Sequence, residues 1–468
     1  MNQAHGVSDS RQLKPYLEYK DSGLAWLGEI PAHWRTLPLG RIGRFSASGI
    51  DKKTVEGEEN VLMVNYTDVY ANTTKTLDKL RNYMQTTCPK WKVKEHSLAK
   101  GDILFTPSSE TEAEVGFSAV VIEDLVKVVY SYHLIRLRPD SNIGLDLGFS
   151  KFLCNNTGVL SQFTAACKGT TRQILTREDF RDTIVSLPPI EEQRDIAAFL
   201  DGETAKIDAL IERMERLIEL LQEKRSALIT QAITKGLEPN VPMKDSGIEW
   251  LGKIPAHWDL LSLKRCVLLK AGSIKTGPFG SQLLAANMQG EDVKVYNQRT
   301  VIDRDFLKGD VFISREKFQE LKAFEIYPGD VLVTTRGTIG RCAIVPADSD
   351  QGILHPCLMR IQPDPAQLLR EYIALLIQES NLVRTQLAIA SNATTIDVIY
   401  SDTMRQILIP KPPISEQAAI IKWINELMAE IHRLNEMVLE AIDRLKEYRT
   451  ALISAAVTGK IDLRESIL

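Results

Sequence analysis

The chain has 468 residues, enough for several compact units, because single cores rarely grow past roughly 250 residues. Its composition, 44% hydrophobic and 25% charged, is ordinary for a water-soluble protein. The net charge of -4 and the pI near 6.1 exclude a strongly basic, DNA-coating protein. Any affinity for nucleic acid must therefore come from local basic residues or from partner proteins.

Cysteine usage and hydropathy narrow the possible classes of protein further. The six cysteines are scattered and form no C-x-x-C pair, which argues against a disulfide framework or a structural zinc site and fits a reducing cytoplasm. The N-terminus lacks a charged start followed by an apolar stretch, so we expect no secretory signal. No apolar run approaches the ~18 residues of a membrane span.

The main signal in the sequence is an internal repeat. The segment KDSGLAWLGEIPAHW at Lys20–Trp34 returns as KDSGIEWLGKIPAHW at Lys244–Trp258. PPIEEQ at 188–193 returns as PPISEQ at 412–417, and KRSALITQAITKG at 224–236 is matched by YRTALISAAVTGK at 448–460. All three pairs share an offset of 224 residues. The repeat predicts a tandem duplication of one unit.

The repeats divide the chain into six segments. They are, in chain order, an N-terminal repeated segment (1–34), a first module (35–187), a central long helix (188–236), a linker with the second repeated segment (237–258), a second module (259–411), and a C-terminal long helix and tail (412–468).

Each module is predicted to be mixed α/β. Short apolar runs at 61–64, 102–105, 119–122, 126–130, 331–334 and 343–345 are typical of strands. Between the two modules only fragments correspond, such as LAKGDILFT at 98–106 and IYPGDVLVT at 326–334. One shared fold with two different surfaces is expected to bind two different ligands.

Candidate contacts to DNA are polar and basic residues in loops beside the predicted strands. Arg and Lys can read guanine edges, Asn and Gln can read adenine, and Ser, Thr and Lys mainly hold phosphates. A loop Arg or Lys is also often only a solvated charge, and the GPFGS run at 277–281 fits a simple tight turn. The first module offers Lys52, Lys53, Asn65, Tyr66, Thr106, Ser108, Ser109, Lys168, Thr170, Thr171 and Arg172. The second offers Lys275, Asn297, Gln298, Arg299, Thr334, Thr335, Arg336, Arg341, Asn392, Thr394 and Thr395.

Two long helices are predicted after the repeated Pro-Pro pairs, each ending near a glycine, Gly236 and Gly459. Apolar residues recur at heptad spacing, as in a coiled-coil seam. We favour pairing of the two helices within the chain, in antiparallel fashion, over dimerisation or docking onto another protein's helices. The predicted seam is Leu200, Ile207, Leu210, Met214, Leu217, Leu221 and Leu228 in the first helix, and Ile424, Ile431, Leu434, Val438, Leu445 and Leu452 in the second.

Recognised catalytic and cofactor motifs are missing from the sequence. There is no G-x-x-x-x-G-K-[ST] phosphate loop, no G-x-G-x-x-G turn, no H-E-x-x-H and no G-x-S-x-G. His33 and His257 recur without an acidic or cysteine partner at ligand spacing, so we expect them to be structural. We therefore predict no catalytic residues, no metal site and no bound cofactor. An unrecognised methyltransferase or nuclease and a protein-binding coiled-coil adaptor are the competing hypotheses.

Five features together resemble the specificity subunits of type I restriction-modification systems. They are the DSG-x-x-WLG-x-IPAHW openings, the GDIL and GDVL strands, NYTDVY at 65–70, IKTGPFGSQL at 274–283 and the two PPI-x-EQ helices. The resemblance covers nearly the whole chain. It implies an α+β fold, with two target-recognition domains joined by an antiparallel coiled coil in a pseudo-twofold tandem repeat.

The same resemblance implies a function and a set of partners. Each domain would read half of a bipartite, asymmetric site in double-stranded DNA. Two methyltransferase subunits would bind S-adenosylmethionine, and two restriction-translocase subunits would use ATP and Mg. This chain would carry none of these cofactors and would have no contact with a membrane.

Overall fold

The repeated opening segment folds into the same hairpin twice. Strands β1 (Tyr19–Asp21) and β2 (Glu29–Pro31) pair antiparallel, and β15 (Met243–Asp245) pairs with β16 (Lys253–Pro255) at the equivalent register. In each hairpin the aspartate that ends the first strand accepts a hydrogen bond, at 2.9 Å, from the backbone N–H of the glycine two residues on. Both glycines, Gly23 and Gly247, have φ near +75°, a conformation that glycine adopts without strain. The sequence repeat is therefore a structural repeat.

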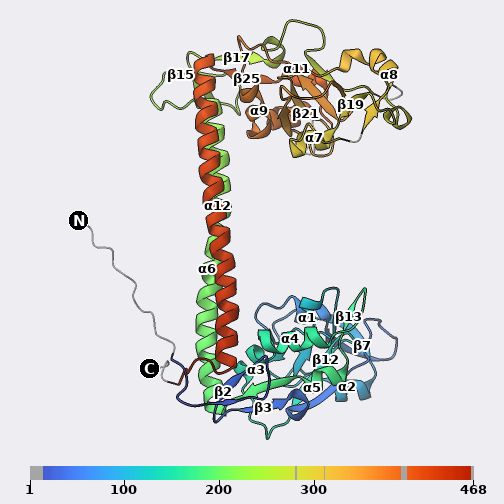
Figure 1. Ribbon diagram of the computed structural model, residues 1–468, viewed down its shortest axis with the longest axis vertical. Coiled ribbons are helices and arrows are strands. Elements are labelled where there is room, and N and C mark those ends of the chain that lie inside the picture. The colour runs from blue at the N-terminus through green and yellow to red at the C-terminus, as the bar shows by residue number, and fades with distance from the viewer. Residues whose placement is uncertain (1–13, 280–281, 310, 392–397, 465–468) are drawn as a thin grey trace, which may run out of the picture. The chain divides into compact units, whose positions relative to one another are not determined.

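The computed structural model describes residues 14–279, 282–309, 311–391 and 398–464 (Figure 1). The chain divides into two compact units, one formed by 1–214 together with 440–468 and the other by 215–439. The first unit thus joins the two ends of the sequence, whereas the second is continuous.

The first unit contains two mixed sheets. One has the order β4 (Gly43–Ala47), β12 (Ile135–Pro139), β8 (Ile103–Phe105), β10 (Ser118–Val121), β6 (Thr76–Leu77), and the other the order β11 (Val128–Tyr130), β5 (Glu59–Val64), β7 (Met84–Cys88). Two short antiparallel pairs are β3 (Arg35–Pro38) with β14 (Ile184–Leu187), and β9 (Ser108–Ser109) with β13 (Gln173–Ile174). The helices are α1 (Tyr66–Tyr70), α2 (Lys90–His96), α3 (Leu147–Leu153), α4 (Thr157–Ala166) and α5 (Arg177–Asp182).

The second unit repeats this plan. Its sheets have the orders β18 (Ile274–Thr276), β24 (Leu358–Ile361), β21 (Val331–Thr334), β22 (Cys342–Ile344), and β20 (Phe312–Ile313), β19 (Val293–Tyr296), β23 (Gly352–Leu354). Strand β17 (Asp259–Ser262) pairs with β25 (Leu408–Lys411), as β3 does with β14. The helices are α7 (Gln298–Asp303), α8 (Arg315–Glu320), α9 (Arg370–Gln378), α10 (Asn381–Ser391) and α11 (Ser401–Gln406). Strands are present at all six predicted runs, and the mixed α+β class is confirmed.

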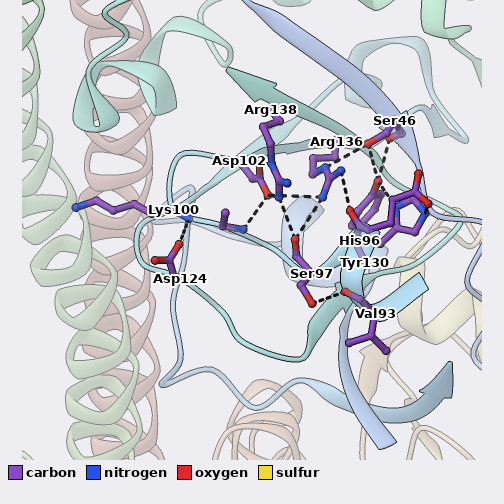
Figure 2. Close-up of polar contacts among 12 residues, drawn as sticks. Ser46, Val93, His96, Ser97, Lys100, Asp102, Asp124, Tyr130, Arg136 and Arg138 are labelled. Atoms are coloured by element: carbon purple, nitrogen blue, oxygen red, sulfur yellow. Dashed lines mark hydrogen bonds and ion pairs between the residues drawn. The ribbon is translucent and has the colours of Figure 1, made fainter. Parts of the chain in front are cut away.

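A buried polar network supports each module beneath its loops. In the first, the Arg136 guanidinium donates from Nη1 to the carbonyl of Ser97 at 3.3 Å, and Arg138 pairs with the Asp102 carboxylate at 2.6 Å (Figure 2). In the second, Arg360 donates to the carbonyl of Glu325, and Gln362 donates to Asp330 at 2.7 Å. Arg136, Asp102, Arg360, Asp330 and Gln362 are buried, where polar groups are usually hydrogen-bonded, whereas Arg138 is partly exposed. The network ties strands and loop backbone together in the same way in both modules.

Two long helices, α6 (Ile190–Lys235) and α12 (Ile414–Val457), each contribute to both units. In the first unit Leu200 of α6 shares a hydrophobic core with Val457 of α12. In the second unit Ile233 of α6 shares a core with Ile424 of α12. Gly236 and Gly459 follow the two helices with φ of +78° and +73°, so the predicted left-handed helix stops are confirmed. No helix among the described residues has the length and apolar character needed to cross a membrane.

All but two of the residues predicted for the seam are buried or partly buried, and their packing as a coiled coil stays a prediction. Leu210 and Leu217 are wrong: their exposed fractions are 40% and 44%. The positions one residue further on, Ile211 and Ile218, are partly buried instead, and Ile211 packs against the core of the first unit. Buried or partly buried seam residues are Leu200, Ile207, Met214, Leu221, Leu228, Ile424, Ile431, Leu434, Val438, Leu445 and Leu452.

Candidate nucleic-acid interface

Three segments that are far apart in the first module meet at the start of α1. The Arg172 guanidinium donates from Nε to the Ser108 hydroxyl at 3.1 Å, where strand β9 pairs with β13. Tyr66 is hydrogen-bonded to Ser109 and lies close enough to Arg172 to feel its charge, while burial raises the pKa of the Tyr66 phenol. Tyr66 also stacks on Tyr70, with ring centroids 5.3 Å apart. The structure thus brings four of the predicted residues into one patch: Tyr66, Ser108, Ser109 and Arg172.

Lys52 extends this patch on the side of His133. Burial lowers the pKa of His133 below its usual range, and the charges of Lys52 and Arg172 lower it further. Lys52 and Arg172 therefore both lie near the His133 imidazole, and the charge of Asp51 opposes their effect on its pKa. Lys53 is exposed beside Lys52, and Asn65 is the partly buried N-cap of α1.

Carboxylates border the first-module patch as well as cations. The hydroxyl of Tyr70 donates to Glu114 and is the main reason that the pKa of this carboxyl lies below its usual range. Glu110 and Glu112 are exposed close by. A carboxylate accepts hydrogen bonds only, and at a DNA base edge it pairs with the amino group of cytosine. The first module therefore presents acceptors together with its donors.

The loop at 168–172 forms a tight turn. A backbone bridge joins Lys168 to Ile174, and a Cβ on Gly169 would lie 2.0 Å from the carbonyl oxygen of Arg172. Only glycine fits at this position of the turn. Lys168, Thr170 and Thr171 are exposed at the loop tip.

Three predicted contacts are wrong because their side chains are buried. Thr106, Thr334 and Thr335 are at most 1% exposed. The Thr106 hydroxyl donates to the carbonyl of Phe117 at 3.3 Å, and the Thr334 hydroxyl donates to the carbonyl of Thr338. Each of these two threonines follows the repeated Gly-Asp strand and closes the loop after it. Ser109 is also buried, and its side chain is hydrogen-bonded to Tyr66.

The second module places a different set of side chains at the equivalent loops. A Cβ on Gly337 would lie 3.5 Å from Nε2 of Gln298, so the Gln298 amide lies against the loop that carries Arg336. The Arg336 guanidinium lies over the ring of Phe279, 5.5 Å from its centroid, and a backbone bridge fixes Arg336 opposite Val398.

Other predicted residues of the second module have internal partners. The Asn297 side chain caps α7 by accepting from the backbone N–H groups of Arg299 and Thr300. Arg299 pairs with Asp303 at 3.5 Å. Arg341 is exposed. Asn392, Thr394 and Thr395 lie outside the described residues.

A groove of about 330 Å³ lies beside Phe279 and was not predicted from the sequence. It is lined by Lys275, Phe279, Phe324, Ser401 and Arg405, among others. The Lys275 ammonium lies 4.2 Å from the centroid of the Phe324 ring. Burial lowers the pKa of Lys275, and the neighbouring charge of Arg360 lowers it further. Motifs could not reveal this groove, since its residues come from separate segments that only the fold brings together.

Among the described residues, no cluster of His, Cys, Asp or Glu could hold a metal ion. Each candidate surface is instead a set of loop side chains on a repeated α+β fold. The fold and these surfaces define a binding protein with two modules of one design and different exposed residues.

The chain matches the type I restriction modification DNA specificity domain over residues 34–222 and 285–444, and it belongs to this family. It is 24% identical over 318 residues to the EcoBI specificity subunit of Escherichia coli, covering 65% of this chain and 64% of that relative. Identity to the putative MjaX specificity subunit of Methanocaldococcus jannaschii is 21% over 445 residues, covering 94% of this chain and 96% of the relative. Members of this family are the non-catalytic subunits of their systems, so the predicted class is confirmed.

Two solved structures share the fold. A chain from a study of complex assembly and conformational transition in a type I R-M system superposes with a TM-score of 0.63 at 19% identity, covering 92% of this chain and 99% of that one. The HsdS subunit of Thermoanaerobacter tengcongensis gives a TM-score of 0.52 at 19% identity, covering 92% and 98%.

Proposed function

We propose that this chain gives a type I restriction-modification complex its DNA sequence specificity by recognising a bipartite, asymmetric site. Residues 35–187 and 259–411 act as the two target-recognition domains, each reading one half of the site. Methyltransferase and restriction-translocase subunits, two of each, are positioned by this chain, and they carry S-adenosylmethionine, ATP and Mg. The complex acts on DNA in the cytoplasm.

The observation that carries this proposal is the contrast between the repeated frame and the loops it supports. The hairpins, the buried arginine network and the helix ends occur twice with matching contacts. The exposed loops differ: the first module presents Tyr66 and Arg172, and the second presents Gln298 and Arg336. A duplicated frame with two different surfaces suits the recognition of two unlike base sequences.

The two long helices are the proposed spacer. Asp208 of α6 pairs with Arg449 of α12 at 2.9 Å, and Ser186, just before α6, donates to the carbonyl of Val457 at the end of α12. These contacts support an antiparallel coiled coil whose two helices are related by a pseudo-twofold axis. Fixed spacing between two recognition elements makes the separation of half-sites a property of the protein.

Co-expression with a cognate methyltransferase subunit, followed by long-read mapping of methylated adenines, tests the function. We expect methylation confined to a split motif with two unlike halves. Exchanging Arg35–Leu187 for the module of a relative keeps the β3–β14 pair intact, because Arg35 and Leu187 are partners in its register. This exchange should change one half of the motif, and exchanging 259–411 should change the other. A well-formed complex without sequence-restricted methylation would refute the proposal.

A further inference from the structure

We infer that Gln298 and Arg336 are the base-reading pair of the second module, with Arg336 directed at a guanine and Gln298 at an adenine, while the adjoining groove holds a DNA phosphate. This inference rests on the proposed function and names the bases that the second half-site contains. The inference is based on the polar groups of the module whose hydrogen-bonding capacity is still free.

Most candidates in the second module have their hydrogen-bonding groups engaged. The Asn297 carbonyl oxygen already accepts two backbone hydrogen bonds, and Arg299 is paired with Asp303. Within the described part of the chain, the Gln298 amide makes no hydrogen bond and Arg336 pairs with no carboxylate. Gln298 is partly exposed and Arg336 is exposed, so both retain their full donor sets for a ligand.

The Arg336 guanidinium is held in place by an aromatic surface. Phe279 is 41% exposed and lies beneath it. The loop bearing Phe279 packs against backbone, since a Cβ on Gly277 would lie 2.2 Å from the carbonyl oxygen of His355. The guanidinium is planar, and its position over the ring restricts the side chain before DNA binds; two of its N–H groups can then donate in parallel to O6 and N7 of guanine.

Gln298 lies at the correct place to read the neighbouring base. Gly337, with φ of +63°, places the Arg336 loop directly against the Gln298 amide. A side-chain amide offers one acceptor and two donors, which match N6 and N7 of adenine. The two side chains therefore suit adjacent purines.

The groove has a different chemistry, suited to an anion. Lys275 and Arg405 line it, and Arg360, which lies 3.9 Å from Asp330, is close enough to lower the pKa of Lys275. Asp402 lies 3.8 Å from Arg405 and is 88% exposed, so it compensates this charge only weakly. Partly desolvated like charges are stabilised by a bound anion. A phosphate of the strand that crosses Phe279 would supply it, with Ser401 as a further donor.

The test is methylation mapping of the co-expressed complex with single substitutions. Arg336→Ala should relax one guanine position and Gln298→Ala one adenine position, each by roughly 5- to 150-fold in discrimination, in the half-site assigned to residues 259–411. Arg336→Gln should shift its position from guanine towards adenine. Lys275→Ala should leave the motif intact, weaken DNA binding at all sites and reduce the slope of log affinity against log salt by about 1.

Lys317→Ala is the control, because Lys317 lies on α8 of the same module, is paired with Glu320 at 2.6 Å and belongs to no candidate surface; its motif should be that of the wild type. A wild-type split motif that survives Arg336→Ala, Arg336→Gln and Gln298→Ala would overturn this inference and leave the proposed function standing. A motif altered by Lys275→Ala would overturn the phosphate assignment. Absence of any motif in the wild-type complex would instead refute the proposed function.

Discussion

At the scale of single residues, one glutamate in each half joins the repeated hairpin to the start of a long helix. Glu192 accepts hydrogen bonds from the Trp34 indole at 2.8 Å and from His33 Nε2 at 2.5 Å. Glu416 receives the same two bonds from Trp258 and His257, at 2.7 and 2.6 Å. The recurring histidines thus have the structural role predicted from the sequence. Their acidic partner escaped detection because it lies in another segment, 159 residues away in both halves.

Replacing Glu192 by glutamine should destabilise the first unit. A neutral amide has a single acceptor oxygen, and its NH2 group would face the indole or imidazole donor, so we expect a loss of roughly 1–3 kcal/mol. Glu191→Gln is the matched control: Glu191 is 75% exposed and pairs with Arg194, and such exposed pairs contribute about 0–1 kcal/mol. Thermal unfolding of both variants measures the difference. Equal midpoints would show that the buried contacts add no stability.

At the scale of elements, the long helices show what a sequence pattern can and cannot determine. The series Leu200, Ile207 and Met214 predicted the helix and one line of its buried face. The intervening line can fall three or four residues further on, and both choices are apolar here: Leu210 or Ile211. Composition cannot decide between them, because the choice depends on where the partner helix lies. That information is tertiary, and it explains the error at Leu210 and Leu217.

Alanine substitutions at two positions of α6 that lie one helical turn apart should therefore reduce stability unequally. Ile207 is 6% exposed within the core of the first unit, so Ile207→Ala should cost about 2–5 kcal/mol. Leu210 is largely solvated, and Leu210→Ala should cost less than about 1 kcal/mol. Denaturant unfolding of the two variants provides the comparison. A larger loss for Leu210→Ala would mean that the helix face is assigned incorrectly.

At the scale of the whole molecule, the tandem repeat predicted the two modules and the helix ends, and short apolar runs predicted six of the strands. The candidate interface was predicted only in part. The candidate contacts Arg172 and Arg336 are exposed, but Thr106 and Thr334, which directly follow the Gly-Asp strands, are buried. The pattern of polar residues does not show which hydroxyl closes the loop. It also cannot show that Arg405 and Lys275 line one groove, because α11 and β18 are adjacent only in the folded chain.

The same long-range organisation makes the last residues of the chain part of the first unit. Leu452, Ala456 and Val457 belong to the core that also contains Trp34, and Lys460 donates to the carbonyl of Glu29 at 2.6 Å. Removing 440–468 should therefore expose the core of the first unit while leaving 215–439 complete.

We expect this truncation to raise amide hydrogen exchange in 16–34 and 149–163 by more than about tenfold, because protection there depends on burial against the lost segment. Exchange in 259–411 should stay at its full-length value, and this second unit serves as the internal control. Unchanged protection in 16–34 would show that the first unit folds without the C-terminal residues. Loss of protection throughout the chain would show that the two units unfold as one, since the truncation removes no residue of the second.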